Sequence, residues 1–289
     1  MSSLKELKQR IANVSSTQQL IKAMDIVAST KLQRVRTQLE RVRPIYRQLK
    51  RIVEEAGREE AARAHIFYAG REAKNSLYIV LTSDRGFSGG YNANIVAKAL
   101  DHMNQGKNER ILVVGSKGYE FFKKRGKNII RKIIDLPDAQ VYYGAEAIAN
   151  WVIDLYRTGE VDEVFIAYTH FVNVLSYVPC VERLLPVVTG DKPPLVWSER
   201  KYEPDLATFI DNTIPLYLHM SLFRAFSEAH TCEQAARMIS MDEAGKNAEE
   251  MLEELTSMYN RKRQAAITQE LSEIFGSTTI LHKGGDHGS

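Results

Sequence analysis

A loop rich in glycine and small polar residues is the first place where this sequence could carry chemistry. It runs Thr82-Ser-Asp-Arg-Gly-Phe-Ser-Gly-Gly-Tyr-Asn92, after a strand-like segment and before a helix-like one. Glycine-rich turns in that position bind phosphate groups in many α/β proteins. This loop has neither the spacing of a dinucleotide fingerprint nor the Gly-Lys-Ser/Thr of a P-loop. We therefore expect a tight turn that packs the sheet onto its helix, with nucleotide binding as the less favoured hypothesis.

Histidines and cysteines give no sign of a catalytic or metal site. The seven histidines are scattered without metal-ligand spacing, and Cys180 and Cys232 form no Cys-x-x-Cys motif. No Ser-His-Asp set and no motif-placed pair of carboxylates is visible. We therefore predict that the chain is not an enzyme by itself, has no catalytic residues, and needs no cofactor or metal.

The densest polar cluster lies near the C-terminus, in residues 259–273. Arg263, Gln264, Thr268 and Glu270 fall within two helical turns there. The small residues Ala265 and Ala266 between them would let another chain approach closely. Taken alone, this cluster also fits a solvated helix face.

A long helix is predicted at the N-terminus by apolar residues that recur at alternating steps of three and four. Such spacing keeps side chains on one seam and specifies a left-handed coiled coil. A helix of this length would span about 80 Å at ~1.5 Å per residue. The seam consists of Leu4, Leu7, Ile11, Val14, Gln18, Ile21, Asp25, Ala28, Leu32, Val35, Leu39, Val42, Tyr46, Leu49, Val53 and Ala56.

A second long helix is predicted after the last proline, because the residues that follow Pro215 are mostly good helix formers. Asp211, Asn212 and Thr213 supply N-cap oxygens, and Pro215 suits the first turn. The expected seam runs through Met241, Ala244, Ala248, Met251, Leu255, Met258, Lys262 and Ala265, then moves to Ile267, Leu271 and Ile274.

The charges of the two ends are opposite. Residues 1–58 hold 13 basic and 5 acidic side chains, a net of +8, whereas residues 216–289 hold 7 and 11, a net of −4. Opposite charge favours an antiparallel pairing of the two helices within one chain, although separate helices or a dimeric coiled coil remain alternatives. The surplus on the first helix also suggests an acidic partner.

The middle of the chain alternates short apolar strands with helices, which is typical of a small α/β domain with a largely parallel sheet. Strands are expected at 77–82, 111–114, 129–134, 164–169 and 181–188, and helices at 91–103, 117–124 and 142–156.

The whole chain thus divides into an N-terminal coiled-coil helix, an inserted Rossmann-like α/β domain, a C-terminal coiled-coil helix and a flexible tail. Residues 191–204, with three prolines, are expected to link the domain to the second helix. The N-terminus lacks a signal-peptide core, and no apolar run is long enough to span a membrane, so we expect a chain that starts in the cytosol. The four parts are expected at 1–58, 74–190, 211–280 and 281–289.

Ten segments spread along the chain form a recognisable set of motifs. The segments are Ile11–Val14, Thr17-Gln18, Lys22–Leu32, Arg43-Pro44, Thr82–Asn92, Phe171–Asn173, Leu184–Pro186, Glu233–Met238, Tyr259–Arg261 and Gln264–Glu270. In these segments and in their order, the chain resembles the gamma subunit of the F-type ATP synthase over nearly its whole length. The last segment is highly specific to that family.

The resemblance implies a non-catalytic rotor shaft that couples ion flow through the membrane ring to ATP synthesis or hydrolysis in an alpha–beta hexamer. It implies contacts with the catalytic beta subunits through Arg263, Gln264, Thr268 and Glu270, and through Lys22 and Met24 on the facing helix. It also implies alpha subunits, an epsilon subunit and a membrane c-ring as partners, one copy per complex and no nucleic acid. The implied location is peripheral, on the cytoplasmic side of a bacterial plasma membrane.

Two other functions fit parts of the sequence. A nucleotide-binding α/β enzyme with helical arms would bind or turn over nucleotide as the pure chain. A basic coiled-coil adaptor for nucleic acid would bind duplex with a steep salt dependence.

Overall fold

The computed structural model describes residues 3–103, 108–189 and 201–283, with side chains up to residue 275. The chain divides into two compact units, one made of residues 1–26 with the C-terminal residues from 241 on, and the other of residues 27–240. Two long helices contribute to both units: α1 (Leu4–Ala56) and α6 (Leu206–Lys283). We describe each unit by itself.

The unit of residues 27–240 contains a five-stranded sheet with the order β3-β2-β1-β4-β5. The first four strands in this order are parallel, and β5 runs antiparallel to β4. The largely parallel sheet and its alternation with helices are confirmed. The elements are η1 (Glu60–Ala64), α2 (Ile66–Ala69), β1 (Asn75–Leu81), α3 (Tyr91–Met103), β2 (Asn108–Val114), α4 (Ser116–Lys124), β3 (Ile129–Ile133), η2 (Asp138–Gln140), α5 (Val141–Arg157), β4 (Glu163–Asn173) and β5 (Ser176–Leu185).

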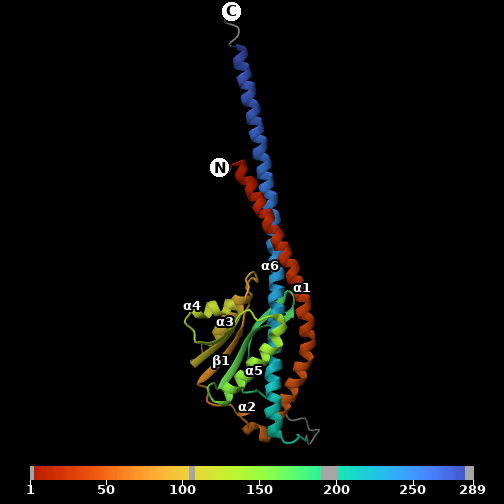
Figure 1. Cartoon of the computed structure of the whole chain (residues 1–289), viewed down its shortest axis with the longest axis vertical. Helices are drawn as coiled ribbons and strands as arrows, with labels where there is room; N and C mark the ends of the chain where they lie inside the picture. The colour runs from red at the N-terminus through yellow and green to blue at the C-terminus, as the bar shows by residue number, and fades with distance from the viewer. Residues whose placement is uncertain (1–2, 104–107, 190–200, 284–289) are drawn as a thin grey trace, which may run out of the picture. The chain divides into compact units, whose positions relative to one another are not determined.

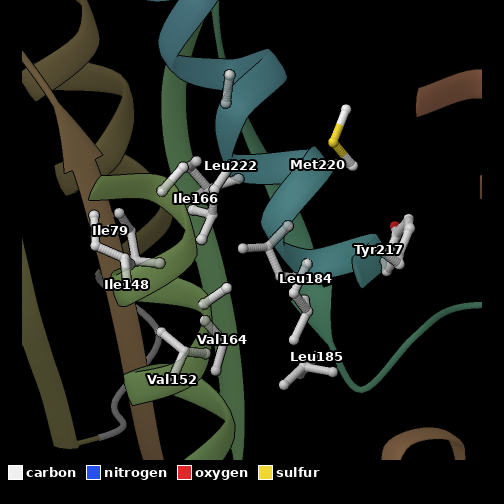
Figure 2. Packing of buried hydrophobic residues seen from close by; sticks show 14 of the residues in the cluster. Ile79, Ile148, Val152, Val164, Ile166, Leu184, Leu185, Tyr217, Met220 and Leu222 are labelled. Atoms are coloured by element: carbon white, nitrogen blue, oxygen red, sulfur yellow. The ribbon is translucent and has the colours of Figure 1, made fainter. Parts of the chain in front are cut away.

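Helices cover both faces of the sheet, which explains why the central strands read as continuous apolar runs. On one face, α5 and α6 pack over β1, β4 and β5 (Figure 1). Figure 2 shows Ile148 of α5 beside Ile79 of β1, Val152 of α5 beside Val164 of β4, and Leu222 of α6 beside Ile166 of β4. On the other face, α3 and α4 cover β1 and β2 through a separate cluster that includes Val96.

The N-terminal seam is confirmed along α1. All sixteen seam positions are buried or partly buried, while most of the residues between them are exposed. In the larger unit, Leu32 and Leu39 share a cluster with Cys232 and Ala235 of α6. Nearer the start of α6, Tyr46 stacks on Tyr217, with ring centroids 6.2 Å apart. Lower numbers on α1 therefore meet higher numbers on α6, so the two helices are antiparallel.

Within the smaller unit, α1 and α6 also lie against each other. Ile21 faces Gly245, where an added Cβ would lie 3.8 Å from its side chain. Counting from this contact at equal rise, Leu4 at the start of α1 lies opposite about residue 262 of α6. The part of α6 that follows therefore extends past the end of α1.

The seam expected on α6 was wrong in part. Met241, Ala244, Ala248, Leu255 and Lys262 are buried or partly buried as expected. Met251, Met258 and Ala265 are exposed, whereas the residues that follow them, Leu252, Tyr259 and Ala266, are partly buried. The sequence does not choose between the members of these pairs, because both are small or apolar. The expected continuation through Ile267, Leu271 and Ile274 was also wrong, since all three are exposed.

The start of α6 also differs from expectation. The helix begins at Leu206, and Asp205 caps it: its carboxylate accepts the Thr208 backbone N–H at 2.9 Å and the Thr208 hydroxyl at 2.9 Å. These hydrogen bonds lower the pKa of Asp205. Asp211 instead forms an ion pair with Arg157 at 2.8 Å, and Pro215 lies inside the helix. A proline is least disruptive in the first turn, which misled the sequence argument. Most of the expected linker at 191–204 and of the tail at 281–289 lies outside the described residues.

Candidate partner-binding surfaces

The glycine-rich loop at 82–92 uses its polar groups to hold its own backbone. Asp84 accepts the Ser116 N–H at 2.8 Å and the Asp135 N–H at 3.0 Å, which ties the loop to the start of α4 and to the turn after β3. Asn92 accepts the Ser83 N–H at 2.9 Å. The contacts are those of a packing turn.

A close approach of two strand ends requires glycine at this edge of the sheet. Gly115 has φ +94°, and a Cβ there would lie 2.3 Å from the Thr82 carbonyl oxygen. The Thr82 hydroxyl donates to the Val114 carbonyl at 2.7 Å and accepts the Gly118 N–H at 3.0 Å. The carboxyl end of the parallel strands is thus filled by the protein itself. Among the described residues, no group of three or more metal-ligating side chains comes together.

The four predicted contact residues on the last part of α6 are all exposed: Arg263, Gln264, Thr268 and Glu270. Residues three, four and seven apart lie on one face of a helix, so these residues form two neighbouring stripes. The Thr268 hydroxyl donates to the Gln264 backbone carbonyl at 2.9 Å, so this bond does not involve the Gln264 side chain.

Polar and apolar side chains alternate along the first stripe, whereas two polar residues precede two apolar ones along the second. The first holds Arg263, Ile267, Glu270 and Ile274, and the second holds Gln264, Thr268, Leu271 and Phe275. Ile267, Leu271, Ile274 and Phe275 are 49%, 50%, 59% and 70% exposed. Exposed apolar residues gathered in this way make the segment a candidate surface for contact with another protein.

The predicted residues on α1 form a separate surface. Lys22 is exposed, and Met24 is 36% exposed beside Leu20, which is 64% exposed. Because Ile21 lies opposite Gly245, this surface is about 27 Å from Arg263 along the axis of α6 at ~1.5 Å per residue. The structure therefore does not bring the two groups of predicted residues into one site.

A buried cluster of charged residues was missed by the sequence argument. Glu228 of α6, whose side chain is 1% exposed, accepts from Arg43 of α1 at 3.2 Å and lies 3.4 Å from Arg224. Burial alone would lower the pKa of Arg224, but Tyr168 and Glu182 outweigh that effect and raise it, so this side chain stays charged. The available signal was a pair of opposite charges four residues apart within the apolar run 214–229.

Comparison with known proteins gives one family. The ATP synthase family model matches residues 3–281. The gamma chain of the ATP synthase from Desulforamulus reducens is 39% identical over 284 residues, which cover 97% of this chain and 100% of the relative. The gamma chain from Staphylococcus saprophyticus is 35% identical over 97% of this chain and 100% of its own length.

The chain belongs to the ATP synthase gamma chain family. As a member of it, the chain is a subunit of the ATP synthase central stalk rather than an enzyme by itself. The central stalk of the Tetrahymena thermophila mitochondrial ATP synthase is similar, with a TM-score of 0.61 and 26% identity over 78% of this chain and 99% of that one. A chain of the Euglena gracilis mitochondrial enzyme shares the fold, with a TM-score of 0.69 and 20% identity over 99% and 97% of the two chains.

The family accounts for the paired helices and the inserted α/β domain as parts of one stalk subunit. It confirms the resemblance found in the sequence, and neither alternative, the nucleotide-binding enzyme or the nucleic-acid adaptor, describes this family. Within the described residues, no helix has both the length and the apolar character needed to cross a membrane.

Proposed function

We propose that this chain is the rotating shaft of an ATP synthase, coupling ion flow through a membrane ring to ATP synthesis or hydrolysis in an alpha–beta hexamer. The observation that carries the proposal is the part of α6 beyond about residue 262, which extends past the end of α1 and exposes apolar residues in regular stripes. Apolar side chains that are about half exposed or more, gathered on one stretch of helix, are commonly covered by another protein.

The mixture of polar and apolar side chains on this segment fits a bearing. Apolar contact is non-directional, so it permits sliding between rotational positions. Arg263, Gln264, Thr268 and Glu270 would supply the directional contacts that hold the shaft at defined angles against the catalytic beta subunits. Charge-assisted hydrogen bonds of this kind contribute about 1.5–3 kcal/mol each.

Lys22 and Met24 would form a second contact with the hexamer, lower on the shaft. The net charge of +8 on residues 1–58 suits an acidic element of a catalytic subunit. The further partners that we propose are the alpha subunits, an epsilon subunit and the c-ring, with one copy of this chain in each complex and no nucleic acid. The complex would hold the chain at the cytoplasmic side of a bacterial plasma membrane.

The test compares Arg263→Glu with Arg41→Glu in complexes reconstituted in lipid vesicles. Both residues are exposed arginines, but Arg41 lies outside the proposed surfaces. Arg263→Glu should leave assembly intact while lowering both ATP turnover and ion pumping, and Arg41→Glu should change them much less. Equal activity of Arg263→Glu and the unchanged chain, or equal damage from Arg41→Glu, would show that this residue makes no gripping contact.

A further inference from the structure

The buried charged cluster connects three elements that are far apart in the sequence. Glu228 of α6 accepts from His170 Nδ1 at 2.5 Å and from the Phe171 backbone N–H at 3.2 Å, both on β4. The same carboxylate accepts from Arg43 of α1 at 3.2 Å. Arg43 also donates to the Phe171 carbonyl oxygen. One carboxylate thus joins both helices to the β4–β5 hairpin.

Arg224, one turn before Glu228, makes the second half of the connection. Its guanidinium donates to the Tyr168 hydroxyl at 2.5 Å and to Glu182 of β5 at 2.6 Å. Its flat face lies over the Tyr46 ring of α1, 4.3 Å from the centroid. The side chain is only 6% exposed, so water competes little with these contacts.

These bonds differ in kind from the packing around them. Most of the remaining contact between α6 and the sheet is apolar, as Figure 2 shows for Leu222 beside Ile166. Apolar contact resists separation but sets no preferred direction. Charge-assisted hydrogen bonds are directional, so they oppose turning of a helix about its own axis against the sheet.

We propose that Arg224 and Glu228 form the joint that transmits torque between the helix pair and the α/β domain. The proposal rests on the rotary function proposed above, and it assigns these two residues a positioning role that needs no contact with another subunit. Arg224 supplies two of the four charge-assisted bonds from α6 to the hairpin, and Glu228 supplies the other two.

The experiment measures the torsional stiffness of the joint in the assembled complex. The hexamer is fixed to a surface, and a bead is attached to a cysteine that replaces the exposed Lys124 of α4, with Cys180 and Cys232 changed to alanine. At the pauses between rotation steps, the variance of the bead angle is inversely proportional to the stiffness. Arg224→Met is compared with Arg36→Met, which removes an arginine from an exposed ion pair of α1 in the same unit.

Arg224→Met should widen the variance by up to about twofold, since it removes half of the directional bonds that act in parallel. Arg36→Met should leave it unchanged. A rotating Arg224→Met complex with unchanged variance would overturn the joint. If the Arg224→Met chain does not assemble, the test uses Glu182→Gln, because the partly exposed Glu182 side chain can change without burying an unpaired charge. Glu182→Gln should also widen the variance of the bead angle. An unchanged variance in this variant would overturn the proposal. A failure of the proposed function looks different, since the bead on the otherwise unchanged chain would then not rotate.

Discussion

Replacing Leu39 by alanine should destabilise the chain far more than the same change at Leu20. Leu39 is 1% exposed and lies in the cluster between α1, the hairpin and α6. Three carbon atoms leave the core, which removes about 2.4 kcal/mol of transfer free energy at ~0.8 kcal/mol each. The facing residues Cys232, Ala235 and Ala236 are short and cannot swing into the gap. A cavity term is therefore added, and the total should be about 3–5 kcal/mol.

Leu20 is the matched control, because it lies on the same helix but is 64% exposed. Leu20→Ala should change the free energy of unfolding by less than about 0.5 kcal/mol. Guanidinium unfolding of the full chain, followed by far-ultraviolet circular dichroism, gives both values from the midpoints. Leu39→Asp should cost more than Leu39→Ala because it buries an unpaired charge. Equal midpoints for Leu39→Ala and Leu20→Ala would refute the buried seam.

Two further predictions concern the loop at 82–92 and the two cysteine thiols. Asp84→Ala should lower the free energy of unfolding by about 1–3 kcal/mol, since it leaves the Ser116 and Asp135 N–H groups without their acceptor. The pure chain should show no ATP turnover before or after this change. Turnover that falls with Asp84→Ala would mean that the loop is a catalytic site. Burial raises the pKa of the Cys180 thiol from 9.0 to about 11 and raises that of Cys232 as well. Near neutral pH both thiols should react with Ellman's reagent much more slowly in the folded chain than after unfolding. The folded chain should also lose stability as the pH rises from 9.0 to about 11, because the Cys180 thiol of the unfolded chain releases its proton first. Fast reaction of both thiols in the folded chain would contradict their burial.

The fold was largely predictable where one residue pattern left a single choice. On α1, most seam residues stand between polar neighbours. Where an exposed apolar residue adjoins the seam, as Leu20 adjoins Ile21 and Ile45 adjoins Tyr46, the regular spacing on both sides still selected the inward position. On α6, pairs such as Met251-Leu252 and Met258-Tyr259 present apolar side chains on two adjacent faces. Only packing against α1 selects one of them. The start of α6 was misplaced for a similar reason, since both Asp205 and Asp211 could cap a helix.

The candidate surfaces were predictable in part. Arg263, Gln264, Thr268 and Glu270 are exposed on one stretch of helix, as their sequence spacing indicated. Their role came from the resemblance to a family, because an exposed polar helix face has many uses. The joint at Glu228 could not be predicted, since its partners Arg43 and His170 are 185 and 58 residues away and meet it only through the tertiary fold.

The most direct test of the rotary function is to watch this chain move. The chain carrying a bead at position 124 would be assembled with its alpha and beta subunits, and the hexamer would be fixed to glass. Adding ATP should then drive rotation in one direction, in steps that stop when ATP is withdrawn. A complex that contains this chain and hydrolyses ATP while the bead stays still would contradict the central claim.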